Sequence, residues 1–158
     1  MKKLFIICLL FVAKFSVAQT ESASPVAWEI ATRQNDAGEP INVLLNVSLE
    51  NHWHIFASDA GGDGMAISTS VVLEKFDKKN KKIDAINVTD SLATEKPVDV
   101  NMEGFGMVHF FDKNYSYWVP IDKNVYRVQA KITYQACNDK MCLAPVDKVL
   151  NLQVRSNK

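Results

Sequence analysis

Cysteine is scarce in this chain, and its scarcity limits what disulfides contribute to the fold. The 158 residues contain three cysteines, and Cys8 lies in an N-terminal apolar segment that we expect to be removed. Small exported domains that depend on disulfides for stability are dense in cysteine, whereas only Cys137 and Cys142 remain here. Hydrophobic residues make up 47% of the chain, so we expect the core to stand without a bridge.

Beyond its first residues the chain has no apolar run long enough to cross a membrane. Lys2 and Lys3, an apolar stretch over residues 4–12, and the small residues Ser16 and Ala18 are typical of a secretory signal peptide. A retained amphipathic anchor is the alternative. We expect residues 1–18 to be cleaved after Ala18, residues 19–158 to form one exported domain, and the mature chain to make no stable membrane insertion.

An excess of positive charge is also missing. Three of the 18 basic residues lie in the expected signal peptide, which leaves 15 against 18 acidic residues. Such a surface has no basic field to hold nucleic acid or anionic lipid. The lysine-rich residues 78–82 are therefore expected to form a solvated turn, and we expect no nucleic-acid partner.

No segment has a convincing helical period, and the pattern is instead one of short strands between turns. Strands are expected at residues 26–31, 41–49, 53–56, 68–76, 107–111, 115–121, 126–134 and 146–154, with a weak signal around Ile86 and Val88. The turn formers at 35–40 predict that the first two strands make a hairpin. Together these features predict an all-β fold, an immunoglobulin-like antiparallel β-sandwich.

Cys137 and Cys142 are separated by four residues and lie between two strand-like runs. If residues 138–141 form a hairpin loop, the cysteines face each other about 4.5–5.5 Å apart and a disulfide can close. Such a ring of roughly six residues restrains the unfolded chain by about 2 kcal/mol, less than a long-range bridge. The spacing leaves two interpretations open: a dithiol for exchange with other proteins, or a bridge that pins the turn.

A metal site is a further alternative. The two cysteines with His52, His54 or His109, or with nearby methionines, would be ligands for copper or zinc. Structural zinc usually needs a second Cys or His pair at short spacing; His52 and His54 would share one face of a strand, but they lie far along the chain from the cysteines. Cysteine-histidine hydrolysis is disfavoured because two cysteines so close oxidise each other in an exported setting. We therefore expect no metal and no cofactor.

Three segments resemble the N-terminal periplasmic domain of the DsbD thiol:disulfide interchange protein family. Residues 133–137 (Thr-Tyr-Gln-Ala-Cys), with Cys142 and Pro145, resemble the family's active-site hairpin. Residues 51–56, with Gly62 to Gly64 after them, resemble its aromatic strand and the loop that follows. Residues 103–106 (Glu-Gly-Phe-Gly) resemble its cap loop. The family hairpin generally has one more residue between its cysteines.

The resemblance implies an immunoglobulin-like periplasmic domain that relays electrons from a membrane-embedded thiol reductase to exported thioredoxin-like oxidoreductases, here as a stand-alone domain. It implies that Cys142 forms mixed disulfides and that Cys137 resolves them. The remaining implied site residues are Phe105 as an aromatic cap, Glu103 beside it, and His54, Phe56 and Tyr134 lining the site. A binding module with a static bridge, using Trp53, His54 and Phe105 as a contact patch, is the alternative.

Overall fold

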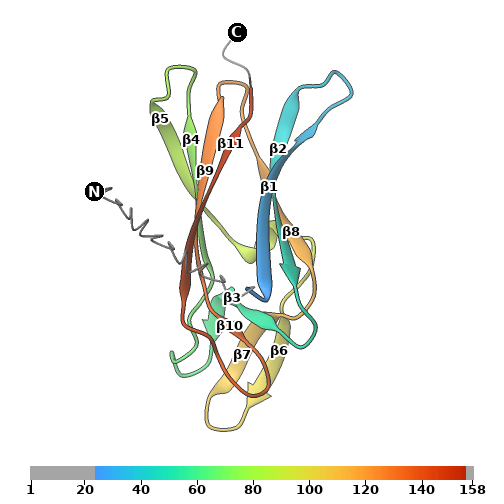
Figure 1. The fold of residues 1–158 in the computed structure, drawn as a ribbon, viewed down its shortest axis with the longest axis vertical. Coiled ribbons are helices and arrows are strands. Elements are labelled where there is room, and N and C mark those ends of the chain that lie inside the picture. Colours follow the sequence, from blue (N-terminus) through green and yellow to red (C-terminus); the bar gives the residue numbers. More distant parts are fainter. Residues whose placement is uncertain (1–23, 156–158) are drawn as a thin grey trace, which may run out of the picture.

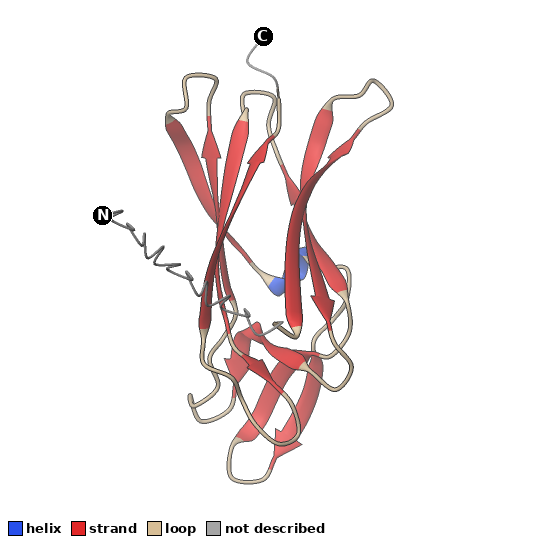
Figure 2. Cartoon of the chain, viewed as in Figure 1, coloured by secondary structure: helices blue, strands red, loops and turns tan. Residues whose placement is uncertain are grey.

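The computed structural model describes residues 24–155, so the expected signal peptide and its cleavage site lie outside the described residues. The elements are β1 (Val26–Gln34), β2 (Pro40–Leu49), β3 (His54–Gly61), β4 (Ser70–Phe76), β5 (Lys82–Val88), the 3-10 turn η1 (Asp90–Leu92), β6 (Val98–Met102), β7 (Gly106–Phe111), β8 (Tyr115–Pro120), β9 (Arg127–Tyr134), β10 (Ala136–Cys137) and β11 (Val146–Gln153). Within residues 24–155, η1 is the one helical element (Figure 2).

The strands form three antiparallel sheets, ordered β1-β2-β8, β11-β9-β4-β5 and β10-β3-β7-β6. The first two face each other along the long axis, and the third lies at the lower end of the molecule (Figure 1). The predicted immunoglobulin-like antiparallel sandwich is therefore confirmed. Its third sheet includes β10, so the cysteine hairpin lies at this end of the molecule.

Alternating apolar residues explain why the two long sheets pack together. In β2, Val43, Leu45 and Val47 are each at most 1% exposed, and their neighbours along the strand are less buried. Strand residues of period two point to one face of a sheet, so this face must be covered. The same pattern in β9 supplies part of the facing layer. Burial on this scale holds the sandwich together through the hydrophobic effect.

Two turn predictions are confirmed. The β1–β2 hairpin closes through Asn35, whose Oδ1 accepts hydrogen bonds from the amides of Ala37 (3.1 Å) and Glu39 (2.8 Å). The lysine-rich turn between β4 and β5 uses Asp77 in the same way, with its Oδ1 accepting from the amide of Lys81 at 2.8 Å. Side chains of Asn and Asp commonly order turns by this local bond.

β3 and β6 differ most from the sequence prediction, while β1 also runs on to Gln34 and the short β10 was not among the predicted strands. β3 extends to Gly61, five residues beyond the predicted end, because Gly61 pairs with Val108 of β7 after an irregularity in the register; Gly61 itself has a left-handed φ of 66°. β6 (Val98–Met102) was not predicted. Its five residues alternate apolar and polar side chains, but the run is short, follows Pro97 and is mostly exposed, and the strand is defined by its pairing with β7.

A partly buried polar contact fixes β3 against the sandwich. The Asp90 carboxylate accepts hydrogen bonds from the Ser58 amide (2.9 Å) and hydroxyl (2.7 Å) on β3, and from the Tyr117 hydroxyl (3.4 Å) on β8. Burial raises the pKa of Tyr117, so its hydroxyl keeps the proton that it donates. This contact holds the strand that carries the site residues His54 and Phe56.

Candidate active site

The two cysteines close a short hairpin at the lower end of the molecule. Cys137 and Cys142 form a disulfide with an S–S distance of 2.01 Å and a Cα–Cα distance of 4.0 Å. The pair forms an antiparallel bridge, and the intervening turn closes through the Asn138 amide, which donates to the Met141 carbonyl at 2.9 Å. The predicted hairpin loop over residues 138–141 is confirmed.

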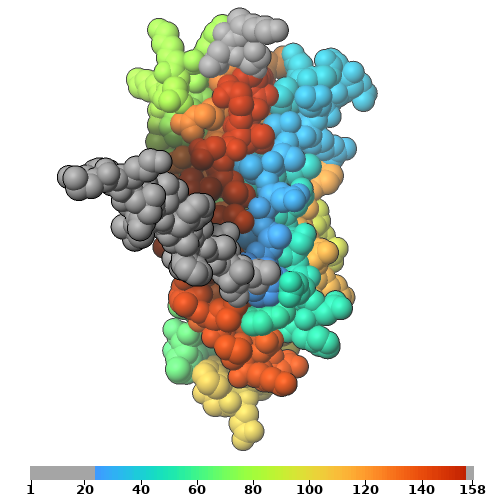
Figure 3. All heavy atoms as spheres, in the orientation of Figure 1, coloured from blue at the N-terminus to red at the C-terminus, as the bar shows by residue number. Residues whose placement is uncertain are grey.

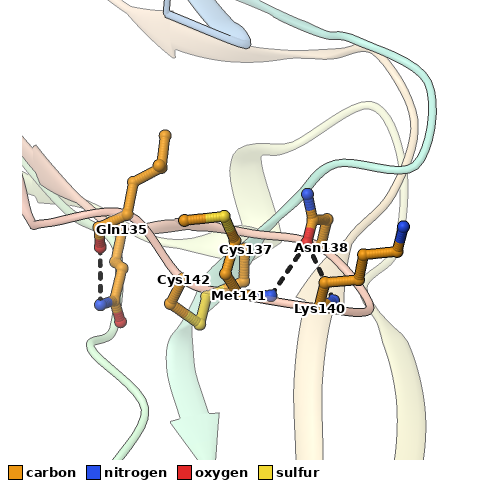
Figure 4. Close-up of a disulfide and its surroundings, with 7 residues drawn as sticks. Gln135, Cys137, Asn138, Lys140, Met141 and Cys142 are labelled. Carbon is orange, nitrogen blue, oxygen red and sulfur yellow. Dashed lines mark hydrogen bonds between the residues drawn. A yellow bond between two sulfur atoms is a disulfide. The ribbon is translucent and has the colours of Figure 1, made fainter.

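Side-chain amides order this hairpin (Figure 4). Asn138 Oδ1 accepts hydrogen bonds from the backbone amides of Lys140 (2.9 Å) and Met141 (3.0 Å), which fixes the turn from within. On the other side of the bridge, Gln135 Nε2 donates to the Leu143 carbonyl at 3.0 Å. The turn is therefore held by bonds that do not depend on the disulfide.

The two sulfur-bearing residues differ in exposure. Cys137 is 2% exposed and packs in a small cluster with Phe56 and Ala60, whereas Cys142 is exposed to solvent. A thiolate from another protein therefore reaches Cys142 far more easily than Cys137. The two ends of the disulfide are therefore not equivalent in their access to solvent.

A groove of about 440 Å³ surrounds the disulfide. Its lining residues are His54, Phe56, Met65, Ala66, Met102, Phe105, Val108, Gln135, Cys137, Asn138, Asp139 and Cys142. They come from three segments far apart in the sequence, which meet at the lower end of the molecule (orange, yellow and green in Figure 3). The lining is mainly apolar, which suits contact with an apolar protein surface better than with a charged ligand.

Of the site residues that the resemblance implied, the structure brings Phe105, His54 and Phe56 into the groove with the cysteines. Glu103 is exposed on the cap loop and is not among the lining residues. Tyr134 lies elsewhere: it is 2% exposed in the sandwich core, with its ring 5.7 Å from that of Trp28.

Strand geometry explains the position of Tyr134. Successive side chains of a strand point to opposite faces, so a residue three positions before a cysteine need not share its surroundings. Gln135, the next residue, lines the groove instead. Met65 and Met102 also line it and were not predicted, because no local pattern marks a methionine that reaches the site through the tertiary fold.

The cap loop, residues 103–105, joins β6 to β7. It is a tight turn in which the Phe105 amide donates to the Met102 carbonyl at 3.0 Å, and Gly104 adopts a φ of 83° that favours glycine. Phe105 is 44% exposed, which is too much for a core aromatic. The ring therefore stands at the groove as a side chain that can move without disturbing the core.

His54 is half-buried between two aromatic rings. Its ring centroid lies 4.6 Å from that of Phe110 and 5.7 Å from that of Phe56, the latter at an interplanar angle of 84°. Burial lowers the pKa of His54, while the negative charges of Asp139 and Asp112 act in the opposite direction. The imidazole is therefore mainly neutral at neutral pH.

Metal ligation finds no geometric support in the described part of the chain. Across residues 24–155, no group of three or more His, Cys, Asp or Glu side chains is arranged to hold a metal ion. Of the histidines considered as ligands, His109 Nδ1 lies 2.6 Å from Asp99 Oδ1 on the neighbouring strand, and His52 is exposed.

The described residues also include no helix long and apolar enough to cross a membrane.

The described residues thus form an immunoglobulin-like sandwich with an apolar groove at one end. A disulfide lies in this groove and joins the buried Cys137 to the exposed Cys142. The chain belongs to the family described as "Thiol:disulfide interchange protein DsbD, N-terminal", which matches residues 17–154. Among curated protein sequences, none matches the chain.

Two solved structures are similar to this one. The Neisseria meningitidis DsbD N-terminal domain in its reduced form is 15% identical, with a TM-score of 0.49 and a match that covers 82% of this chain and 85% of that one. The N-terminal periplasmic domain of ScsB from Proteus mirabilis is also 15% identical, with a TM-score of 0.55. That match covers 83% of this chain and 47% of the ScsB chain, and it supports the fold.

Proposed function

We propose that this protein relays electrons by thiol-disulfide exchange through Cys137 and Cys142. It receives them from a membrane-embedded thiol reductase and passes them to exported thioredoxin-like oxidoreductases. The observation that carries the proposal is the bridge between an exposed Cys142 and a buried Cys137 inside an apolar groove. Membership of the thiol:disulfide interchange family supports the same chemistry.

The unequal exposure of the two cysteine residues supports a different role for each in the exchange. To load the relay, a donor thiolate attacks Cys142 Sγ, the Cys137–Cys142 bond breaks, and Cys137 Sγ leaves with the electron pair. The donor's second thiolate then displaces Cys142, which leaves a dithiol here and a disulfide on the donor. To unload it, Cys142 attacks an acceptor disulfide, and Cys137 resolves the mixed disulfide that results.

The proposed compartment is the periplasm. The solved relative from Proteus mirabilis is a periplasmic domain, and residues 1–18 have the features of a signal peptide that is cut after Ala18. In this proposal residues 19–158 are the mature domain. Delivery of the electrons itself returns the relay to its disulfide form, because Cys137 closes the bridge when it releases the acceptor.

Whether the bridge can be reduced in the folded protein distinguishes an electron relay from a binding module with a static disulfide. We expect mild dithiol to reduce the Cys137–Cys142 bond while the sandwich stays folded, because the hairpin keeps its own hydrogen bonds and the bridge contributes only about 2 kcal/mol. Circular dichroism and thermal melts of both redox forms measure this. A bridge that resists dithiol until the protein unfolds would make the binding module the better account.

The exposed aromatic of the cap loop gives a second test. In Phe105→Ala we expect the reduced cysteines to react several-fold faster with a small alkylating agent, because the ring no longer shields them. The free energy of unfolding should change by about 0.5 kcal/mol or less, as for other surface positions. Trp118→Ala is the matched control, since Trp118 is 41% exposed on β8 and is not among the groove-lining residues. Equal alkylation rates in all three proteins would show that Phe105 does not act as a cap.

A further inference from the structure

The burial of Cys137 creates a problem for the exchange reaction. When the bridge opens at Cys142, Cys137 Sγ carries the electron pair as a thiolate, yet the residue is 2% exposed and packs against Phe56 and Ala60. A charged sulfur in an apolar site is unfavourable unless a nearby group supplies a proton or a hydrogen bond. The reverse step meets the same difficulty, because a buried thiol must lose its proton before it can attack.

One titratable side chain is placed to meet this need. Cys137 on β10 and His54 on β3 are direct partners in an antiparallel pair. Side chains at such opposed positions lie on the same face with Cβ atoms about 4.5–5.5 Å apart. His54 also lines the groove that holds both cysteines, and the Phe56 and Phe110 rings pack against its imidazole. The fold therefore holds an imidazole beside the buried cysteine.

We propose that His54 exchanges a proton with Cys137 Sγ as the bridge opens and closes, an inference that rests on the proposed exchange function. On opening, the Cys137 thiolate takes a proton from the imidazolium, which His54 had obtained from solvent. On closing, neutral His54 accepts the Cys137 proton, the thiolate attacks Cys142 Sγ in the mixed disulfide, and the partner sulfur leaves with the electron pair. Each step exchanges one S–S bond for another; opening takes one proton from solvent through His54 to Cys137, and closing returns it to solvent by the same route.

The surroundings of His54 favour the closing step at neutral pH. Burial lowers the pKa of the imidazole, so the neutral form that accepts a proton predominates. Asp139 from the hairpin turn and Asp112 after β7 oppose this effect and favour the imidazolium once it forms. The rings of Phe56 and Phe110 carry no charge. His54 is thus a base with two carboxylates that favour its protonated form.

The closing step can be measured without any protein partner. Reduced protein treated with Ellman's reagent releases one coloured thiolate when Cys142 is modified and a second when Cys137 closes the bridge. We expect His54→Phe, which keeps an aromatic ring, and His54→Gln, which keeps a hydrogen-bonding group, to slow the second release roughly 10- to 100-fold at neutral pH. In the unchanged protein this rate should fall as pH drops through the pKa of His54, and both variants should lose that inflection.

His52→Asn is the matched control, because His52 is exposed, is not among the groove-lining residues, and has a left-handed φ of 68° that Asn tolerates. It should close at the unchanged rate. Equal closing rates and pH profiles in all four proteins would overturn the role of His54 while leaving the relay intact. Absence of a second release in the unchanged protein would overturn the exchange function itself. Thermal melts of both His54 variants establish that they are folded when measured.

Discussion

Cys137→Ser is expected to accumulate mixed disulfides with exported thioredoxin-like proteins, whereas Cys142→Ser should accumulate few or none. The reason is the unequal exposure of the two residues. Cys142 is exposed and remains available to a partner in the first variant, while the 2%-exposed Cys137 is the only active-site thiol left in the second. Without the resolving thiol of Cys137, an adduct on Cys142 has no intramolecular route to release.

Cells carrying each variant provide the measurement. Free thiols are blocked on lysis, adducts are separated on non-reducing gels, and the captured proteins are identified by mass spectrometry. The variant that lacks both Cys137 and Cys142 is the matched control for non-covalent association. Equal trapping by the two single variants would contradict the assignment of roles but keep the relay. No adduct with either would favour a binding module with a static bridge.

The sandwich was predictable from sequence because its signals are local. In β2 and β9 the apolar residues recur every second position, and that period alone determines which face is buried. The turns at Asn35 and Asp77 follow from side chains that bond to their own backbone. β6 escaped prediction because its alternating run is only five residues long and directly follows Pro97, which indicated a loop, and its extended form comes from pairing with β7.

The site was predictable only where its residues are close in sequence or match a family motif. The hairpin of Cys137 and Cys142 is local, and the cap loop with Phe105 was found by resemblance. The pairing of Cys137 with His54 joins segments about 80 residues apart, and no periodicity specifies such a register. Tyr134 was misleading for a related reason, because its proximity to Cys137 in sequence does not decide which face of β9 carries it.

Gly61→Ala is expected to be among the most damaging substitutions outside the core. Gly61 pairs with Val108 of β7, has a left-handed φ of 66°, and leaves so little room that a Cβ would overlap the Met107 carbonyl oxygen and lie 2.8 Å from His109 Cδ2. Left-handed strain costs about 1–2 kcal/mol for a residue other than glycine. Overlap with backbone adds about 1–3 kcal/mol. A loss of about 2–5 kcal/mol lowers the melting temperature by roughly 6–20 °C.

Gly64→Ala separates these two contributions. Gly64 also has a left-handed φ, of 90°, but a Cβ there would meet nothing within 4 Å. Its loss should therefore be confined to the conformational strain, and the difference between the variants measures the close approach of β3 to β7. That approach sets the positions of Val108 and the cap loop at the groove, so Gly61→Ala should also speed alkylation of the reduced cysteines while Gly64→Ala does not. Equal stability and equal alkylation rates in the two variants would mean that β7 and its cap loop keep their place without the contact at Gly61.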